Sequence, residues 1–216
     1  TTDKVYESNG NKKGFKETDL LGGIDPYSAS KSSTELMIRA YRESFFKDKI
    51  KCGISSVRAG NVIGGGDWSK NRLIPDSIRS SIANKTIVLR NPNFNRPWQF
   101  VLEPIKGYLI LAKKQYQNPL KYSTCWNFGN KAKSATTVSQ IVKYIIDYWG
   151  RGKLKELSKN KVYEQENLQL DSTKAIKILK WFPTYNIKES VKITTEWYFK
   201  VLQLKKKPID VTNSQI

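Results

Sequence analysis

The sequence has 216 residues, a formal net charge of +19 and no histidine. The lack of histidine excludes Ser-His-Asp triads and histidine general bases, so any catalysis must use Tyr, Lys, Asp, Glu or Thr. Lysine is scattered without a long basic block, and no apolar run approaches the roughly twenty residues of a membrane span, so we expect no nucleic-acid or membrane partner. The two cysteines, Cys52 and Cys125, give no disulfide framework or metal site and fit the reducing conditions of the cytoplasm.

The chain begins with a predicted strand end. Val5 and Tyr6 are typical of β structure and lead into a polar run, so we expect residues 1–6 to form the exposed end of a strand. Thr2, Asp3 and Lys4 would then stand near the carboxyl end of a strand, which is where α/β proteins place their sites.

A helix start follows at Asp25-Pro-Tyr-Ser-Ala-Ser-Lys31. Pro26 suits a first helical turn, and the four-residue step from Tyr27 to Lys31 places both side chains on one face. A phenol beside an ammonium group is an acid–base device, because the positive charge favours the phenolate form. The spacing Tyr-x-x-x-Lys is weak by itself, since a lysine-rich chain produces it by chance and a packed Tyr with a solvated Lys is the simpler interpretation.

This helix is expected to continue along a stripe and to lead into a strand and a glycine-rich loop. The stripe consists of Met37, Ala40, Tyr41, Ser44 and Phe45. The run 52–57 predicts a buried parallel strand, so residues 2–4 and 58–61 should lie at carboxyl strand ends and face one crevice. The glycines of 60–66 lack the lysine of a P-loop, which argues against a nucleotide triphosphate site.

The middle of the chain predicts further alternation of helices and short strands. Helices are expected at 73–85 and 102–115, and strands at 86–89, 98–101 and 125–128. Arg72, Arg90 and Arg96 stand beside turns in a chain whose commoner cation is lysine. Arginine binds phosphate oxygens with two parallel hydrogen bonds, so these three are candidate phosphate contacts, with ordinary surface arginines as the alternative.

The most regular pattern lies at 138–149. Its apolar residues repeat at steps of three and four, Thr137 opens the segment with a capping box, and Gly150 ends it. These aliphatic and aromatic residues predict a core helix. The following residues 153–161 are polar and are expected to form a loop.

Two more helices are predicted before the end of the chain. Asp171 should cap a helix that reaches about Lys180, and residues 186–189 should cap the last helix, whose apolar stripe ends near Val201. Residues 208–216 show no periodicity and are expected to form a tail.

Several long strings of this sequence carry a resemblance to a known family. They are Thr2-Asp-Lys-Val-Tyr6, Gly22-Gly-Ile-Asp-Pro-Tyr-Ser-Ala-Ser-Lys31, Ala59-Gly-Asn-Val-Ile-Gly-Gly-Gly-Asp-Trp68, Arg72-Leu-Ile-Pro-Asp76, Arg90-Asn-Pro92, Arg96-Pro-Trp-Gln99, Trp126-Asn-Phe-Gly129 and Leu170-Asp-Ser-Thr-Lys-Ala175. The chain resembles the extended short-chain dehydrogenase/reductase family over essentially its whole length, and within it the CDP-glucose 4,6-dehydratases. The resemblance implies an α/β fold, namely the C-terminal part of a Rossmann-type doubly wound parallel sheet plus a smaller α/β substrate-binding domain.

The resemblance also implies a division of the chain. Residues 1–62 would be the C-terminal portion of the dinucleotide-binding domain, with its N-terminal half missing. Residues 63–207 would mainly bind the sugar nucleotide, with some segments returning to the Rossmann sheet, and 208–216 would be the tail. Because the missing half would carry the glycine-rich turn that grips the NAD pyrophosphate, we expect this chain alone to bind NAD weakly and to be inactive.

The implied activity is NAD-dependent dehydration of CDP-glucose to CDP-4-keto-6-deoxyglucose, by oxidation at C4, loss of water across C5–C6 and hydride return to C6. Tyr27 would take the proton of the 4-hydroxyl, Lys31 would support Tyr27 and bond the nicotinamide ribose, and Thr2 would bond the same sugar hydroxyl. As a hypothesis, Asp3 is the acid at the 6-hydroxyl and Lys4 is the base at C5 or its electrostatic partner.

The resemblance assigns further residues to binding. Asn61 would contact both cofactor and substrate, and the remaining substrate contacts would be Arg72, Leu73, Ile74, Arg90, Arg96 and Asn127. No metal is expected. A homodimer through the helix that contains Lys31 and Phe45, in the cytoplasm, is also implied.

Two features bear on substrate choice, and two alternatives stay open. Asp3-Lys4 stands where thymidine-diphosphate relatives carry Asp-Glu, which favours a cytidine substrate. Phe100 and Tyr163-Glu164 stand where the family often has histidine, and these departures concern substrate fit.

The alternative functions that stay open are a sugar-nucleotide 4-epimerase or another NDP-sugar 4,6-dehydratase, and a non-catalytic basic binding fragment.

Overall fold

The structure of the protein is a computed structural model that describes residues 1–7, 14–47, 52–89, 91–130, 136–157 and 168–216. These residues form two compact units, each assembled from separate stretches of chain. Unit 1 contains Thr1–Gly60, Glu103–Lys133 and Leu168–Thr184, and unit 2 contains Asn61–Leu102, Ser134–Asn167 and Tyr185–Ile216. Residues 103–133 and 168–184 therefore belong to the unit formed by the beginning of the chain. Arg90 and Tyr163-Glu164 lie outside the described residues.

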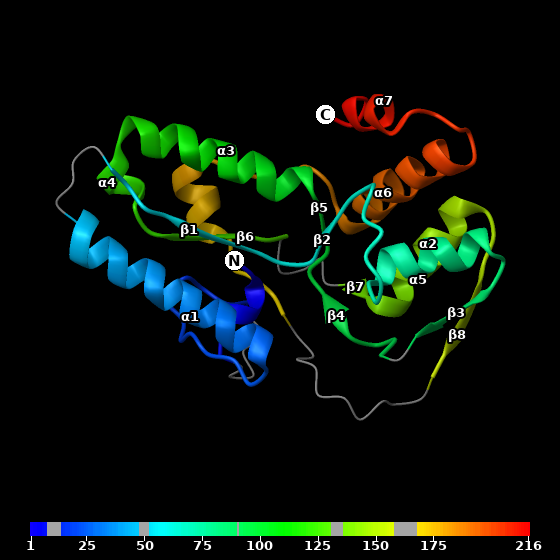
Figure 1. The fold of residues 1–216 in the computed structure, drawn as a ribbon, viewed down its shortest axis with the longest axis horizontal. Helices are drawn as coiled ribbons and strands as arrows, with labels where there is room; N and C mark the ends of the chain where they lie inside the picture. Colours follow the sequence, from blue (N-terminus) through cyan, green and yellow to red (C-terminus); the bar gives the residue numbers. More distant parts are fainter. Residues whose placement is uncertain (8–13, 48–51, 90, 131–135, 158–167) are drawn as a thin grey trace. The chain divides into compact units, whose positions relative to one another are not determined.

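Unit 1 combines a parallel sheet with flanking helices (Figure 1). Its elements are the 3₁₀ helix η1 (Asp3–Val5), α1 (Pro26–Tyr41), the π-helix η2 (Arg42–Phe46), β1 (Ser56–Ala59), α3 (Leu102–Gln117), α4 (Pro119–Tyr122), β6 (Cys125–Phe128) and the π-helix η4 (Ala175–Leu179). Strand β1 pairs with β6 in parallel, Ser56 opposite Cys125, and Thr2 forms a parallel bridge to Ala59. The carboxyl end of β1 therefore lies beside the first residues of the chain.

The core of unit 1 forms where α3 crosses β6. Phe128 and Trp126 of β6 are almost fully buried, and the ring of Phe128 packs edge-on against Trp181 with 5.1 Å between centroids. The helix approaches this closely because Gly107 has no side chain, since a Cβ there would lie 2.4 Å from Phe128 Cδ1. The expected helix at 102–115 is thus confirmed, and its glycine is explained by packing against the sheet.

Two expectations for unit 1 were wrong in detail. Val5 and Tyr6 are buried rather than exposed, because the chain turns into η1 after Thr2 and inserts both side chains into the core with Phe15. The strand expected at 52–57 begins only at Ser56, and Cys52 is exposed.

The expected helix after Lys31 is present as α1 and η2. Its stripe of residues that ends at Phe45 faces outward, and the residues that α1 buries are Ser28, Ser32 and Glu35.

In the residues that the structure describes, unit 2 consists of short strand pairs and four helices. Its elements are β2 (Val62–Ile63), α2 (Leu73–Ile82), β3 (Thr86–Leu89), β4 (Asn95–Arg96), β5 (Gln99–Phe100), β7 (Thr136–Thr137), α5 (Val138–Trp149), β8 (Lys153–Glu156), α6 (Ile187–Leu202) and α7 (Pro208–Asn213). The pairs β2–β5 and β3–β8 are parallel, and β4–β7 is antiparallel. Helix α5 packs against both α2 and α6.

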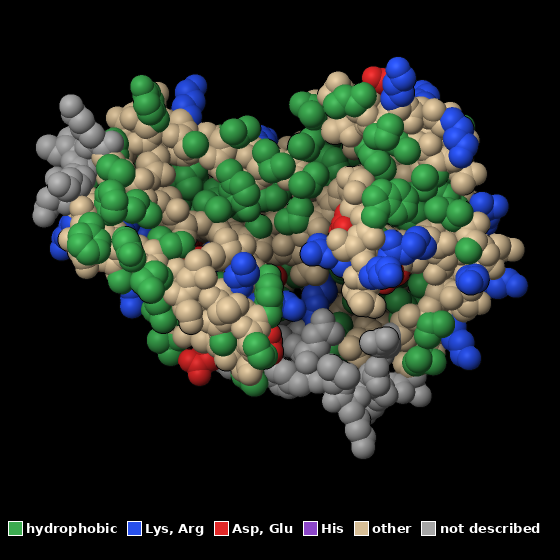
Figure 2. All heavy atoms as spheres, in the orientation of Figure 1, with side chains coloured by type: hydrophobic (Ala, Val, Ile, Leu, Met, Phe, Trp, Pro, Cys, Tyr) green, Lys and Arg blue, Asp and Glu red, His purple; other side chains and the backbone are tan. Residues whose placement is uncertain are grey.

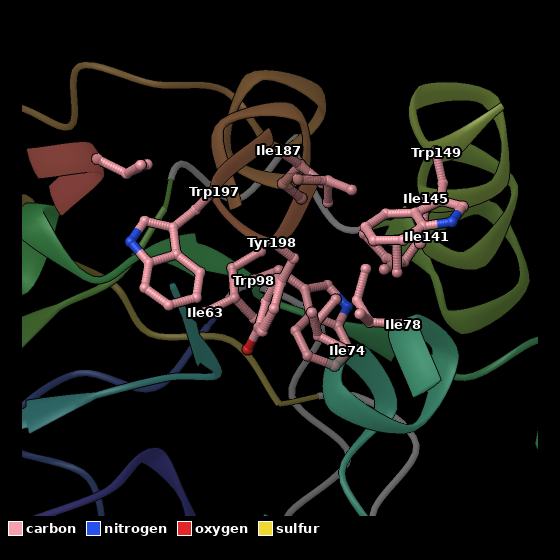
Figure 3. Close-up of a cluster of buried hydrophobic side chains, with 12 residues drawn as sticks. Ile63, Ile74, Ile78, Trp98, Ile141, Ile145, Trp149, Ile187, Trp197 and Tyr198 are labelled. Carbon is pink, nitrogen blue, oxygen red and sulfur yellow. The ribbon is translucent and has the colours of Figure 1, made fainter. Parts of the chain in front are cut away.

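The main core of unit 2 is shown in Figure 3. Isoleucines from β2, α2 and α5 meet Trp98, which lies between β4 and β5, and Trp197 and Tyr198 of α6 (Figure 3). The predicted caps of α5 and α6 are confirmed, while α2 ends at Ile82, three residues before the expected end. Thr137 Oγ1 accepts from Gln140 N, Gly150 ends α5 with φ of 82°, and Asn186 and Glu189 form the capping box of α6.

Two segments of unit 2 differ from expectation. Residues 153–156 were expected to be loop but form β8, which pairs with β3 and keeps its lysines exposed, as suits an edge strand. Residues 208–216 were expected to be an aperiodic tail but contain α7, which begins at Pro208 and buries Val211.

Candidate active site and sugar-nucleotide contacts

The first part of the site is the turn at Thr2, Asp3 and Lys4. Thr2 Oγ1 donates to Asp3 Oδ1 at 3.0 Å and accepts from Lys4 N at 3.4 Å, so the hydroxyl caps η1. Asp3 is 3% exposed, whereas Lys4 is half-buried. The bridge from Thr2 to Ala59 holds this turn at the carboxyl end of β1, as the sequence predicted for residues 2–4.

The second part is the start of α1. Asp25 caps the helix by accepting from Tyr27 N and Ser28 N, and its pKa is lowered by hydrogen bonds from Ser28. Tyr27 is 51% exposed, so its hydroxyl is accessible. Lys31 Nζ lies 5.9 Å from the centroid of the Tyr27 ring and Lys4 Nζ lies 5.8 Å from it. Two ammonium groups, one from each part of the site, therefore face one phenol.

Ser32 joins these two parts. Its hydroxyl, one turn after Ser28, donates in turn to carbonyl oxygens of both neighbouring segments, at 2.8 Å from Val5 O and 2.7 Å from Gly22 O. Close approach of the chain before α1 is aided by Gly23, where a Cβ would lie 2.6 Å from backbone atoms of α1. The sequence pattern gave no signal for Ser32, because its partners are distant in the chain.

A buried ion pair lies beneath the site and was also missed from the sequence. Arg58 of β1 donates to Glu35 of α1 at 2.8 Å, and both side chains are almost fully buried. Ser56 and Thr1 also donate to the Glu35 carboxylate. Burial acts to raise the pKa of Glu35, but the hydrogen bonds from Arg58, Thr1 and Ser56 outweigh it and hold the pKa below its ordinary value. Arg58 is therefore a link between α1 and β1 and does not face a crevice.

Asn127, a predicted substrate contact, is part of the same interior network. Arg58 donates to the hydroxyl of Tyr6, which donates to Asn127 Oδ1 at 2.8 Å. The amide nitrogen of Asn127 donates to Phe15 O at 2.9 Å, and the residue has no exposed surface. The Asn127 side chain makes hydrogen bonds inside unit 1, so Asn127 is not part of the proposed substrate site.

The remaining described candidates belong to unit 2. Arg72 is exposed at the start of α2, where it pairs with Asp67 at 3.6 Å. Leu73 and Ile74 turn their side chains into the core, so only their backbone N–H groups, which lack partners within the helix, could meet a ligand. Arg96 is buried with its guanidinium over the Phe94 ring and donates to Asn95 O.

Two further positions complete the candidate set. Asn61 is half-buried, and its carbonyl accepts from Gln99 N at 2.9 Å, which leaves its side chain for other contacts. Phe100, where the family often has histidine, is 1% exposed and packs edge-on against Tyr185. Phe100 is therefore a core residue of unit 2.

The residues around Tyr27 fit one half of a nicotinamide site. The exposed phenol, the Lys31 ammonium and the Thr2 hydroxyl are donors that could hold a nicotinamide ribose and a sugar hydroxyl. In the described part of the chain there is no cluster of three or more potential metal-ligating residues. Among those same residues, none of the helices has the length and apolar character that crossing a membrane requires.

Known proteins match this chain in sequence and in fold. A family model described as GDP-mannose 4,6 dehydratase matches residues 1–194. The CDP-glucose 4,6-dehydratase of Salmonella typhimurium is 42% identical over 203 residues, which cover 92% of this chain and 56% of that protein. The chain thus spans a little over half the length of this relative.

Solved structures show the same fold. A dTDP-glucose 4,6-dehydratase from Bacillus anthracis in complex with NAD gives a TM-score of 0.77 at 22% identity, over 93% of this chain and 60% of that one. A UDP-glucuronic acid 4-epimerase from Bacillus cereus in complex with UDP-glucuronic acid and NAD gives 0.76 at 19% identity, over 93% and 60%. The α/β fold expected from the sequence is therefore confirmed, and both dehydratases and epimerases share it.

Proposed function

Because this chain belongs to the GDP-mannose 4,6 dehydratase family, we propose that it forms the proton-transfer and sugar-nucleotide-binding part of an NAD-dependent CDP-glucose 4,6-dehydratase. The observation that carries the proposal is the exposed Tyr27 ring with the ammonium groups of Lys31 and Lys4 both within 6 Å of its centroid. The name and 42% identity of the Salmonella relative support cytidine as the base.

Tyr27 is the proton acceptor for the 4-hydroxyl of the hexose. Both Lys31 and Lys4 place their side-chain nitrogens within 6 Å of the centroid of the Tyr27 ring, and the Tyr27 oxygen is the general base that accepts the hydroxyl proton in this proposal. Lys31 bonds the ribose of the cofactor, and Thr2 contacts the same sugar hydroxyl when its own hydroxyl turns away from Asp3 Oδ1, to which it donates in this structure. When bound, NAD supplies the redox chemistry by accepting hydride from C4 and returning it at C6.

The loss of water uses the turn at Asp3 and Lys4. A ketone at C4 acidifies the proton at C5, so elimination needs a base at C5 and an acid at the 6-hydroxyl. In this proposal Asp3 protonates the departing hydroxyl, and Lys4, in the same turn and beside Tyr27, is the base at C5 or the electrostatic partner of that base. The Asp-Lys pair thus performs the step that distinguishes a dehydratase from an epimerase.

Unit 2 supplies the contacts to the sugar nucleotide. Arg72 is exposed and can bind diphosphate oxygens with two hydrogen bonds, and the half-buried Asn61 is a further contact in this proposal, whereas Arg96 is only 4% exposed and is not part of it. The backbone N–H groups of Leu73 and Ile74 lie at the start of α2, where the helix dipole gives a partial positive charge. They can therefore donate hydrogen bonds to an anionic diphosphate.

The proposal is tested by the product of the reaction and by binding. In an enzyme that combines this chain with the NAD-binding half expected from the resemblance, and with NAD and CDP-glucose supplied, a 4-keto-6-deoxy sugar nucleotide is the expected product, and appearance of a 4-epimer instead would make the enzyme an epimerase. The matching binding test is titration of CDP and dTDP into this chain. Tighter binding of CDP is expected, and equal affinity for both would refute the cytidine assignment.

A homodimer through α1 is the second part of the proposal. The helix and η2 expose Leu36, Met37, Tyr41 and Phe45, and the rings of Tyr41 and Phe45 contact each other at 5.5 Å. Helix α3 of the same unit exposes Ile105, Leu109 and Tyr116 at helical spacing. Figure 2 shows hydrophobic side chains at the surface in the region of α1. Exposed apolar stripes of this kind favour helix-to-helix association, and a cytoplasmic location fits the two free cysteines.

A further inference from the structure

Residues 64–71, here called the glycine loop, accept hydrogen bonds from side chains of the helices α2 and α6. Three consecutive carbonyls of this loop accept hydrogen bonds from side chains. Tyr198 of α6 donates to Asp67 O at 2.6 Å, and Arg79 of α2 donates to Trp68 O at 3.0 Å and Ser69 O at 3.1 Å. Burial raises the pKa of Tyr198 to about 12, so its hydroxyl remains a donor at neutral pH. These bonds hold the peptide groups of residues 67–69 in fixed directions.

The glycines of this loop are explained by packing. A Cβ on Gly65 would lie 2.1 Å from Trp197 Cγ, so the backbone rests directly on the indole ring. Trp197 is fixed in turn, because its Nε1 donates to Thr212 Oγ1 of α7 at 2.9 Å. Figure 3 shows Trp197 and Tyr198 side by side on α6. The chain end, expected to be a tail, therefore supports the loop through Trp197.

The outer side of the loop presents Arg72. Asp67 accepts from Ser69 N at 2.9 Å and pairs with Arg72. Burial acts to raise the pKa of Asp67, but the bonds from Ser69 and the charges of Arg72 and Arg79 outweigh it, so the carboxylate stays ionised. Trp68, 45% exposed, packs edge-on against Tyr198 at 5.2 Å. The fixed backbone thus sets the directions of one exposed guanidinium and one exposed indole.

We infer that Tyr198 and Arg79 are positioning residues for nucleotide recognition, which hold the glycine loop so that Arg72 meets the diphosphate without further ordering. The inference rests on the proposed function of Arg72. A loop that is already ordered loses less conformational entropy on binding, so its supports contribute to affinity without touching the ligand.

The test is calorimetric titration of CDP into this chain and two variants. Tyr198→Phe keeps the ring and removes the hydroxyl that Asp67 O needs, and Arg79→Lys keeps the charge but cannot bridge two carbonyls. We expect each to weaken CDP binding about fivefold to tenfold, the effect of losing one or two hydrogen bonds. We also expect the double variant to lose less than the sum, because both act on one loop. Tyr148→Phe, which alters a tyrosine of α5 packed against the same core, is the matched control and should bind CDP as the parent does.

The readouts separate positioning from folding. Thermal unfolding should stay close to that of the parent for Arg79→Lys, whose side chain is 35% exposed, so this variant serves if Tyr198→Phe folds poorly. The tryptophan emission of the variants should differ from that of the parent, because Trp68 loses its fixed contact with the ring at position 198. A Trp68→Phe chain shows which part of the emission comes from Trp68. Folded variants that bind CDP as tightly as the parent would overturn the positioning roles of Tyr198 and Arg79 and leave the proposed role of Arg72 intact. A parent chain that binds no CDP would overturn the proposed role of Arg72 together with it.

Discussion

The guanidinium of Arg58 lies 2.8 Å from the carboxylate of Glu35, with about 3% and 2% of the two side chains exposed. The pair joins β1 to α1, the helix that carries Tyr27 and Lys31. Its stability depends on both members, because a single buried charge without its partner is costly. The ion pair thus links α1 to the sheet, together with the hydrogen bonds from Ser56 and Thr1 to Glu35.

Glu35→Gln should therefore destabilise the fold. The change leaves the Arg58 charge buried without its counter-ion, so the free energy of unfolding should fall by about 3–5 kcal/mol. Urea denaturation followed by circular dichroism measures this. Glu43→Gln is the matched control, because Glu43 pairs with Arg42 at an exposed position and should change stability by less than about 1 kcal/mol. Equal losses in the two variants would contradict the assigned role.

The same pair predicts a pH dependence. The pKa of Glu35 in the folded chain lies below its ordinary value of 4.5, so folding favours the ionised carboxylate. A lowered pKa gives stability that is complete above the unfolded value and is lost as the pH falls through the folded value. The stability difference between the parent and Glu35→Gln should therefore shrink as the pH drops below 4.5. A difference that stays constant down to acid unfolding would contradict this linkage.

Tyr27→Phe should remove catalysis and leave the fold unchanged. Loss of the proton acceptor should lower the rate of 4-keto product formation by about 10²–10⁴-fold. Because Tyr27 is 51% exposed, its unfolding free energy should change by no more than about 0.5 kcal/mol. Tyr116→Phe alters a tyrosine that is 91% exposed and should keep full activity. Product formation at the parent rate in Tyr27→Phe would refute the whole mechanism.

Lys4→Ala should block dehydration at the C5 proton. Without this base, solvent deuterium should no longer enter C5 of the sugar nucleotide, which nuclear magnetic resonance of the product pool in heavy water detects. Lys113→Ala, on the exposed side of α3, should exchange normally. Persistent exchange in Lys4→Ala would assign the base to another residue and leave the role of Tyr27 intact.

Phe45→Glu should weaken self-association. A carboxylate in place of an exposed phenyl ring at the end of the apolar stripe would be buried unpaired in a dimer. Sedimentation velocity should show a dimer for the parent and a monomer for the variant. Leu204→Glu, at an exposed site of unit 2, should leave the association state unchanged. A parent that is monomeric at all concentrations would refute the proposed interface.

The sequence alone determined what depends on neighbouring residues. The helix at 138–149 is confirmed with its cap at Thr137 and its stop at Gly150, because apolar spacing and capping are local properties. Tyr27 and Lys31 are neighbours for the same reason, since one helical turn separates them. The motif strings also identified the extended short-chain dehydrogenase/reductase family, which the family match and the Salmonella relative confirm.

Only the tertiary structure decided which distant segments meet. Lys4 lies beside Tyr27, Arg58 pairs with Glu35, and Tyr198 supports a loop more than a hundred residues earlier, and none of these partners is near the other in the chain. Strand β8 has the polar sequence of a loop and is ordered by pairing with β3. The physical reason is that strand pairing and burial stabilise the chain only when distant segments come together in the folded state, whereas apolar spacing and helix capping act within a few residues.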